Sequence, residues 1–276
     1  TLSATDNVGV TGYYASETST TPSASASGWT SVTSATSYSG SVSFTLSSSS
    51  GTKTVYVWFK DTAGNVSVSV SDSITLTTVI TVTDIDGNVY NTVTIGTQVW
   101  MKENLKVTKY RNGDAIGTTT GSIPSDSSSK YQWAYNDNES NTTTYGRLYT
   151  WYAATDSRGL CPTGWHVPTY AEWTTLTDYL GGKSVAGGKM KEAGTTHWTS
   201  PNTSADNSSG WTALPGGDRF YSGSFLSMGS YGYWWSATEY DANFASECHL
   251  GYDYSNAYRS NFGSKSFGIS VRCVRD

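Results

Sequence analysis

The sequence lacks the features that mark several large classes of protein. It has no apolar run of the roughly 20 residues that a membrane-spanning helix needs, so we expect no direct membrane insertion. Its 17 basic and 22 acidic residues form no basic stripe, which argues against nucleic acid as a partner. The chain starts at Thr1 without a signal peptide, so we expect any export signal or tethering segment to lie upstream.

Histidine and cysteine are scarce, with three of each. Paired carboxylates, a glycine-rich phosphate loop and a Ser/His/Asp order are not evident, so we expect no enzymatic activity, no cofactor and no metal site. The most conspicuous histidine, His166, is better explained as a hydrogen-bonded packing residue than as a base. Three cysteines allow at most one intrachain disulfide, and that possibility favours an extracellular setting.

Composition divides the chain near residues 77–81. Of the first 78 residues, 36 are Ser or Thr, whereas the remainder holds every Cys and His and nine of the eleven Trp. A length of 276 residues also suits two domains. We therefore predict one domain over residues 1–78 and a second over residues 79–276.

The first domain has the pattern of a small β-protein. Apolar residues alternate with Ser over residues 66–76, β-branched and aromatic residues fill 54–60, and residues 62–65 supply a turn between the two. Weaker strands are expected at 42–46 and 12–15, which together predict an all-β, immunoglobulin-like sandwich. Residues 58–66 resemble the closing hairpin of bacterial immunoglobulin-like and fibronectin-like surface modules, and this resemblance implies a spacer.

The second domain begins with a predicted hairpin and contains two predicted helices. Residues 81–90 form strands around an Asp-Gly turn, which explains Asp84, Asp86 and Asn88 better than an incomplete EF-hand does. The first helix is expected over 147–154, where Leu148, Trp151 and Tyr152 make an apolar stripe. The second starts at a capping box of Thr169 and Glu172 and ends at Gly181–Gly182.

Five motifs of this domain resemble those of the major paralogous domain family called FISUMP. They occupy residues 95–105, 146–151, 161–168, 214–217 and 270–275, in the family's order, and the resemblance covers residues 82–276. It implies an α+β, C-type-lectin-like fold with two main helices and a long irregular region near the C-terminus. The predicted architecture is thus an all-β sandwich followed by a C-type-lectin-like domain.

Alternation in the last strand makes one disulfide testable. Ile269, Val271 and Cys273 alternate onto one face of the last strand, so Cys273 points inward, where it could meet Cys161. We predict a Cys161–Cys273 disulfide, which leaves Cys248 as the odd thiol. We also expect a core built on six tryptophans, namely Trp165, Trp173, Trp198, Trp211, Trp234 and Trp235.

Residues 240–267 have the composition of an adaptable binding surface. Tyrosine offers a large contact area with few torsions to freeze, and Ser, Asn and Gly supply adjustable hydrogen bonds. Exposed loop residues with some aromatics tucked underneath would give a similar composition. The predicted ligand-binding residues are Tyr240, Asp241, Asn243, Phe244, Ser246, Cys248, His249, Tyr252, Asp253, Tyr254, Asn256, Tyr258, Ser260, Asn261 and Phe262.

A second resemblance supports the binding interpretation. Residues 234–239, the following Tyr/Asn/Ser/Asp-rich run and residues 270–276 look like the variable region of proteins diversified by diversity-generating retroelements. In such systems, adenine mutagenesis turns Asn codons into many of the residue types found here, Cys248 included, with Glu247 and Lys265 as exceptions. The resemblance implies a receptor-binding or adhesion protein on a cell surface or phage virion, with a protein or glycan on another cell as its partner.

Competing functions are a non-diversified carbohydrate-binding module and a structural cell-surface module. The calcium-binding motifs of C-type lectins are missing, and Tyr135-Asn136-Asp137 is the nearest string, far from the C-terminal face. The formylglycine-generating enzymes share the implied fold, but the three cysteines do not reproduce the paired-cysteine copper site of those enzymes.

Overall fold

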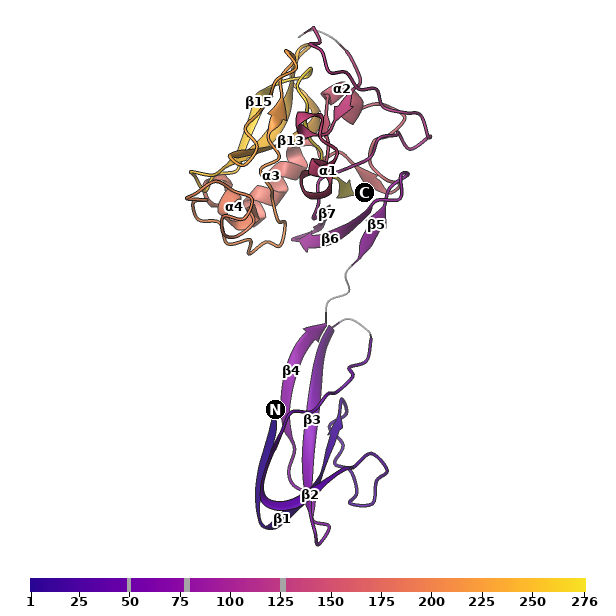
Figure 1. The fold of residues 1–276 in the computed structure, drawn as a ribbon, viewed down its shortest axis with the longest axis vertical. Helices are drawn as coiled ribbons and strands as arrows, with labels where there is room; N and C mark the ends of the chain where they lie inside the picture. Colours follow the sequence, from indigo (N-terminus) through magenta and orange to yellow (C-terminus); the bar gives the residue numbers. More distant parts are fainter. Residues whose placement is uncertain (49–50, 77–79, 125–127) are drawn as a thin grey trace. The chain divides into compact units, whose positions relative to one another are not determined.

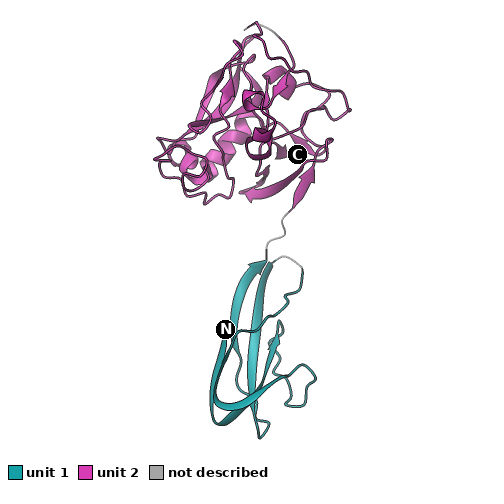
Figure 2. Ribbon diagram, in the orientation of Figure 1, with its two compact units in different colours: residues 1–78 teal, residues 79–276 magenta. Residues whose placement is uncertain are grey.

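The computed structural model describes residues 1–48, 51–76, 80–124 and 128–276, and the chain forms two compact units (Figures 1 and 2). These are residues 1–78 and 79–276, divided where the composition changes. Every described helix lies in the second unit. Among the residues described, no helix has the length and apolar character needed to cross a membrane.

The first unit is all β, as its alternation predicts. Its described residues form a single antiparallel sheet in the order β2-β1-β3-β4. The strands are β1 (Leu2–Ser16), β2 (Thr30–Gly40), β3 (Gly51–Asp61) and β4 (Val70–Leu76). A second sheet packed on the first, which a sandwich requires, is not formed by these residues.

Two details of the first unit differ from expectation. Residues 42–46 form no strand, and β4 starts only at Val70, with Val68 88% exposed and Val70 and Ile74 also exposed. Alternation specifies which side chains share a face, but not that another layer covers that face. The predicted turn after β3 is confirmed, because Asp61 Oδ1 accepts a hydrogen bond from the Asn65 backbone at 2.8 Å.

The second unit is built around two larger sheets. One has the order β10-β17-β7-β6-β5 and the other β15-β14-β13-β16-β9-β8, while β11 and β12 form a separate pair (Figure 1). The strands are β5 (Thr81–Thr83), β6 (Val89–Ile95), β7 (Gln98–Met101), β8 (Gln132–Trp133), β9 (Leu148–Tyr149), β10 (Trp165–His166), β11 (Asp218–Arg219), β12 (Phe225–Leu226), β13 (Tyr231–Glu239), β14 (Phe244–Gly251), β15 (Tyr258–Ser264), β16 (Ile269–Ser270) and β17 (Val274–Arg275).

The helices are short, and only one was predicted fully. The capping box of Thr169 and Glu172 starts α3 as expected. The predicted helix over 147–154 is wrong in its first half, since Leu148–Tyr149 pairs with β16 as strand β9 and only Trp151–Ala154 is helical. The described helices are η1 (Tyr135–Asp137), α1 (Ser140–Tyr145), α2 (Trp151–Ala154), α3 (Tyr170–Tyr179) and α4 (Lys183–Met190).

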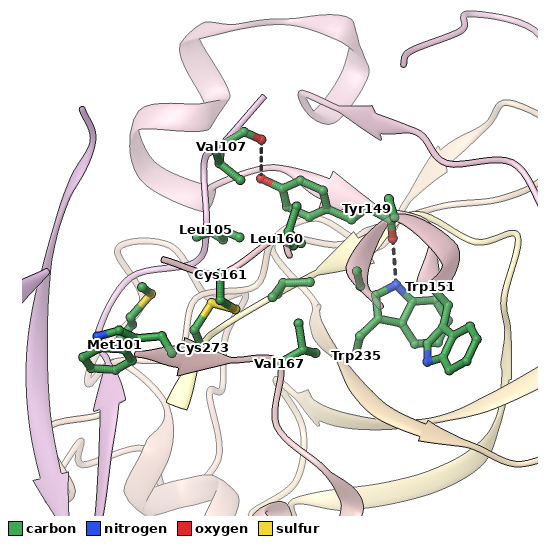
Figure 3. Packing of buried hydrophobic residues seen from close by; sticks show 14 of the residues in the cluster. Met101, Leu105, Val107, Tyr149, Trp151, Leu160, Cys161, Val167, Trp235 and Cys273 are labelled. Atoms are coloured by element: carbon green, nitrogen blue, oxygen red, sulfur yellow. Dashed lines mark hydrogen bonds between the residues drawn. A yellow bond between two sulfur atoms is a disulfide. The ribbon is translucent and has the colours of Figure 1, made fainter. Parts of the chain in front are cut away.

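The two larger of the three apolar clusters among the described residues of this unit form most of its core. The first, shown in Figure 3, includes Trp235, Tyr149 and the predicted Cys161–Cys273 disulfide, which is confirmed. The second is a row of tryptophans: Trp100 and Trp173 have ring centroids 4.9 Å apart, and Trp211 and Trp234 have theirs 5.1 Å apart. All six tryptophans expected in the core are buried.

The C-terminal segment runs between the two clusters. Ile269, Val271 and Cys273 belong to the cluster with the disulfide, as alternation predicts, while Val274 belongs to the tryptophan cluster. The segment therefore joins both halves of the unit, and the disulfide adds a covalent link over a sequence separation of 112 residues.

Candidate functional site

The segment over 240–267 is a strand pair and not the irregular region that the family resemblance implies. Strands β14 and β15 extend the antiparallel arrangement begun by β13 at one edge of the six-stranded sheet. Pairing between the strands satisfies the backbone N–H and C=O groups of this segment, whose side chains are mostly polar. The tyrosine-rich sequence is thus displayed on a regular sheet.

Side chains that face each other across antiparallel strands lie on the same face of the sheet. Trp234 faces Cys248, and Cys248 faces Arg259, so these lie on what we call the inner face, against α3 and the tryptophan row. Tyr233 faces His249, and His249 faces Tyr258, which defines the outer face. Along each strand the two faces alternate.

Aromatic side chains form a continuous group on the outer face. The rings of His249 and Tyr258 stack at 5.3 Å, Tyr254 meets Tyr258 edge-on at 5.1 Å, and Tyr233 lies 5.6 Å from His249. Tyr254 lies over Gly251, where an added Cβ would come within 2.5 Å of its ring. We call Tyr231, Tyr233, His249, Tyr254 and Tyr258 the aromatic patch.

The structure divides the predicted ligand-binding residues into three groups. Two are buried, Ser246 and Cys248, so their prediction as contact residues is wrong: both point to the inner face. Asn261 lies beside them, accepting a hydrogen bond from Ser246 Oγ at 2.8 Å. The remaining residues retain exposed surface on the outer face or at the ends of the β14–β15 hairpin, namely Tyr240, Asp241, Asn243, Phe244, His249, Tyr252, Asp253, Tyr254, Asn256, Tyr258, Ser260 and Phe262.

Cys248 has the environment of a core residue. It is fully buried between Trp234 and Leu250, and burial raises the pKa of its thiol well above the usual value. A protonated, inaccessible thiol is neither a nucleophile nor a metal ligand. Its role here is packing.

Two buried lysines fix the ends of the hairpin. Lys191, which follows α4, donates to the carbonyl oxygens of Gly251 and Tyr254 at 2.9 and 2.8 Å and so holds the β14–β15 loop. Burial lowers the pKa of its ammonium group to about 8. Lys265 donates to Glu239 and to the carbonyl oxygens of Asp241 and Ala242, and so holds the β13–β14 turn.

The two residues that adenine mutagenesis of Asn codons does not reach both have structural roles. Lys265 is 1% exposed and makes the contacts just described. Glu247 is also buried, and its carboxylate contacts His249 Nδ1 at 3.0 Å, beneath the aromatic patch. Both side chains are therefore held in place by contacts within the chain.

Sequence reasoning missed several residues of this surface. Tyr231 and Tyr233 precede the predicted segment, although their period-two spacing with Trp235 could have placed them on one face. Asp218 and Phe220 also come from outside the predicted segment, and they line one cavity with Tyr233. No local pattern signals that approach.

His166 lies away from this surface and joins three segments. Its Nδ1 contacts Asp276 Oδ1 at 2.6 Å, and its Nε2 contacts Glu172 Oε1 at 2.7 Å. Burial lowers the pKa of His166, but the hydrogen bonds to Asp276 and Glu172 outweigh that effect and raise it overall. The histidine thus links the C-terminus to the start of α3, as a hydrogen-bonded packing residue would.

Comparison with known proteins identifies the family. Residues 93–275 match the model of the Fibrobacter succinogenes major domain. The chain belongs to this family. No curated protein and no solved structure is significantly similar to it. Family membership and the disulfide together suggest an extracellular or surface protein.

In this member of the family, residues of the matched motifs build the frame of the fold. Arg272 is buried, with its guanidinium 3.6 Å from the ring centroid of Trp211, and its Nη2 donates to Asn104 Oδ1 at 2.9 Å. The same oxygen accepts from Trp234 Nε1 at 2.8 Å. Asn104 and Arg272 therefore join the two ends of the domain and position β13.

Proposed function

We propose that this protein is a surface-displayed or virion receptor-binding protein whose outer sheet face, with the adjoining hairpin ends, contacts a protein or glycan on another cell. The observation that carries the proposal is the aromatic patch, in which Tyr258 is exposed and the other rings are partly exposed, on strands whose opposite face is a tryptophan core. Tyrosine-rich surfaces on rigid backbones give large contact area at low entropic cost.

The proposal includes diversification of this face by a retroelement on a C-type-lectin-like frame. Support comes from the sequence resemblance and from the burial of Glu247 and Lys265 among residues that vary freely in such systems. Pinning both hairpin ends through buried lysines keeps the backbone fixed while side chains change. The first unit would then act as a spacer between the binding domain and its anchor.

A binding screen tests the proposal directly. The fluorescently labelled full chain is applied to a glycan array and to a display library of extracellular protein domains. Replacing Tyr254, Tyr258 and Phe262 by alanine should abolish binding to the selected partner. A matched triple variant at Ile85, Val89 and Tyr179, which are also exposed in the second unit, should bind as the original does. Equal binding by both triple variants would contradict the proposal.

The neighbouring DNA tests diversification separately. A near-repeat of the final coding segment that differs only at adenines, beside a reverse-transcriptase gene, is the expected arrangement. If the repeat is missing while the alanine variants still lose binding, the face is a fixed binding site. A glycan as the selected partner would favour the carbohydrate-binding alternative, since stacked rings such as Tyr258 and His249 suit sugar faces.

A further inference from the structure

A cavity of about 160 Å³ lies at the covered end of the outer face. A water molecule occupies about 30 Å³ of liquid, so the space could hold roughly five. Most of its wall is apolar, including Phe220, Trp235 and Phe267, and the Phe220 and Phe267 rings lie 4.4 Å apart. Phe262 of β15 completes one side and links the cavity to the exposed surface.

Two carboxylates also line this aromatic cavity. Asp218 is 5% exposed, and its Oδ1 has no hydrogen-bond partner among the residues that the structure describes. Glu247 is buried and contacts only the His249 ring among the charged groups described. A buried carboxylate oxygen without a partner is costly, so its retention indicates that something outside the chain satisfies it.

Among the residues that the structure describes, none supplies a cation to Asp218. Its neighbour Arg219 turns away, with its guanidinium 4.2 Å from the Trp133 ring centroid and its Nη2 donating to Gly121 O at 2.7 Å. Burial raises the pKa of Asp218 to about 6, although a hydrogen bond with Ser227 lowers it in part. The carboxyl group is therefore mostly ionised at neutral pH without an ion pair within the described chain.

The hydrogen-bonding groups that line the cavity indicate which class of ligand it can bind. Besides Asp218 and Glu247, the polar side chains of the wall are Tyr233 and Trp235. The Tyr233 hydroxyl hydrogen-bonds Ser227, and Trp235 Nε1 already donates to Tyr149 O at 2.7 Å. Sugar hydroxyls need donors as well as acceptors, and this wall offers mainly acceptors. An ammonium group is a donor only, and aromatic faces attract cations.

We infer that this cavity binds a primary ammonium group carried on an alkyl chain, with Asp218 as its main acceptor, aromatic rings around the chain and Glu247 as a second negative charge. On a receptor, this group is a lysine side chain. That last assignment rests on the proposed function, whereas binding of a free alkylammonium ion does not.

Calorimetric titration of the full chain with n-pentylammonium chloride tests the inference, with 1-pentanol as the neutral probe of similar shape. We expect saturable binding of the amine at least tenfold tighter than that of the alcohol. Asp218→Asn should lower amine affinity at least tenfold and raise the melting temperature, so lost binding cannot be ascribed to unfolding. Asp178→Asn, which removes an exposed carboxylate of α3, should bind the amine unchanged.

Equal affinity for amine and alcohol, or full amine binding by Asp218→Asn, would overturn the inference. So would tight binding of a monosaccharide that depends on Asp218. Failure of amine binding, with receptor binding still dependent on Tyr254, Tyr258 and Phe262, would reject the cavity assignment alone. If the amine binds but those alanine changes leave receptor binding intact, the proposed function alone is rejected.

Discussion

The two faces of the β13–β14–β15 sheet differ although they are made by the same strands. On the inner face, Trp234, Cys248 and Leu250 are fully buried against the tryptophan row. On the outer face, His249 and Tyr258 retain exposed surface and contact mainly each other and neighbouring tyrosines. Around His249 and Tyr258, period-two alternation thus separates residues that hold the fold from residues available for contact, whereas Trp235 and Glu247 at the covered end of the outer face are buried.

The largest expected effect comes from the inner face. Trp234→Ala removes a fully buried ring and the hydrogen bond to Asn104 Oδ1, so it should lower the free energy of unfolding by about 3–5 kcal/mol. Tyr258→Ala, on the outer face of the same sheet, should cost less than about 1 kcal/mol. Chemical denaturation of both variants measures the two losses. Equal losses in the free energy of unfolding would contradict the difference between the two faces.

The disulfide should contribute nearly as much. Replacing Cys161 and Cys273 by alanine should lower the free energy of unfolding by about 2–5 kcal/mol, because the link closes a long loop in the unfolded chain. Thiol titration supplies the check on pairing. Unreduced protein should show no reactive thiol when native and a single one, Cys248, after denaturation. Three thiols after denaturation would rule the link out.

Replacing Asp218 should raise the free energy of unfolding, whereas the changes above lower it. Its pKa rises from 3.8 to about 6 on folding, so the unfolded chain loses this proton first and stability falls as pH rises through that window. At about 1.36 kcal/mol per pKa unit, the cost at pH 7 approaches about 3 kcal/mol. Asp218→Asn should therefore be more stable than the original chain at pH 7 and show no such gain at pH 3.5, measured by denaturation at both.

The smallest expected effect is at His166, which lies on β10 of the five-stranded sheet. Because its pKa is raised on folding, its contribution to stability is complete below about pH 6.5 and is lost as pH rises through the folded value. The melting temperature of the original chain minus that of His166→Asn should therefore shrink from pH 5.5 to pH 8.5. A difference independent of pH would show that protonation of His166 plays no part.

Sequence reasoning succeeded where the signal is local. The capping box that starts α3 and the Asp-Gly turn before β6 involve residues within four positions of each other. The link from Cys161 to Cys273 was predictable because alternation placed Cys273 inward within a resembling family. Ligand binding by residues 240–267 stays a prediction, and the division of this segment into inner and outer residues was not predicted.

Elements decided by distant contacts could not be read from the sequence. Helix α4 contains Gly187 and Gly188, which weaken a helix pattern, yet an added Cβ at Gly187 would lie 2.2 Å from Asn256 O. Glycine here permits close packing by the β14–β15 loop. In the same way, Leu148 and Tyr149 form a strand only because β16, more than a hundred residues later, pairs with them.

Randomising each face separately measures most directly whether the outer face can change without loss of the fold. One displayed library varies the outer residues His249, Tyr254, Tyr258 and Phe262, and another varies the inner residues Ser246, Cys248 and Leu250, each sorted for resistance to protease. We expect most outer-face variants to resist cleavage as the original chain does and most inner-face variants to be cleaved. Similar cleavage of both libraries would contradict the separation of frame and binding surface.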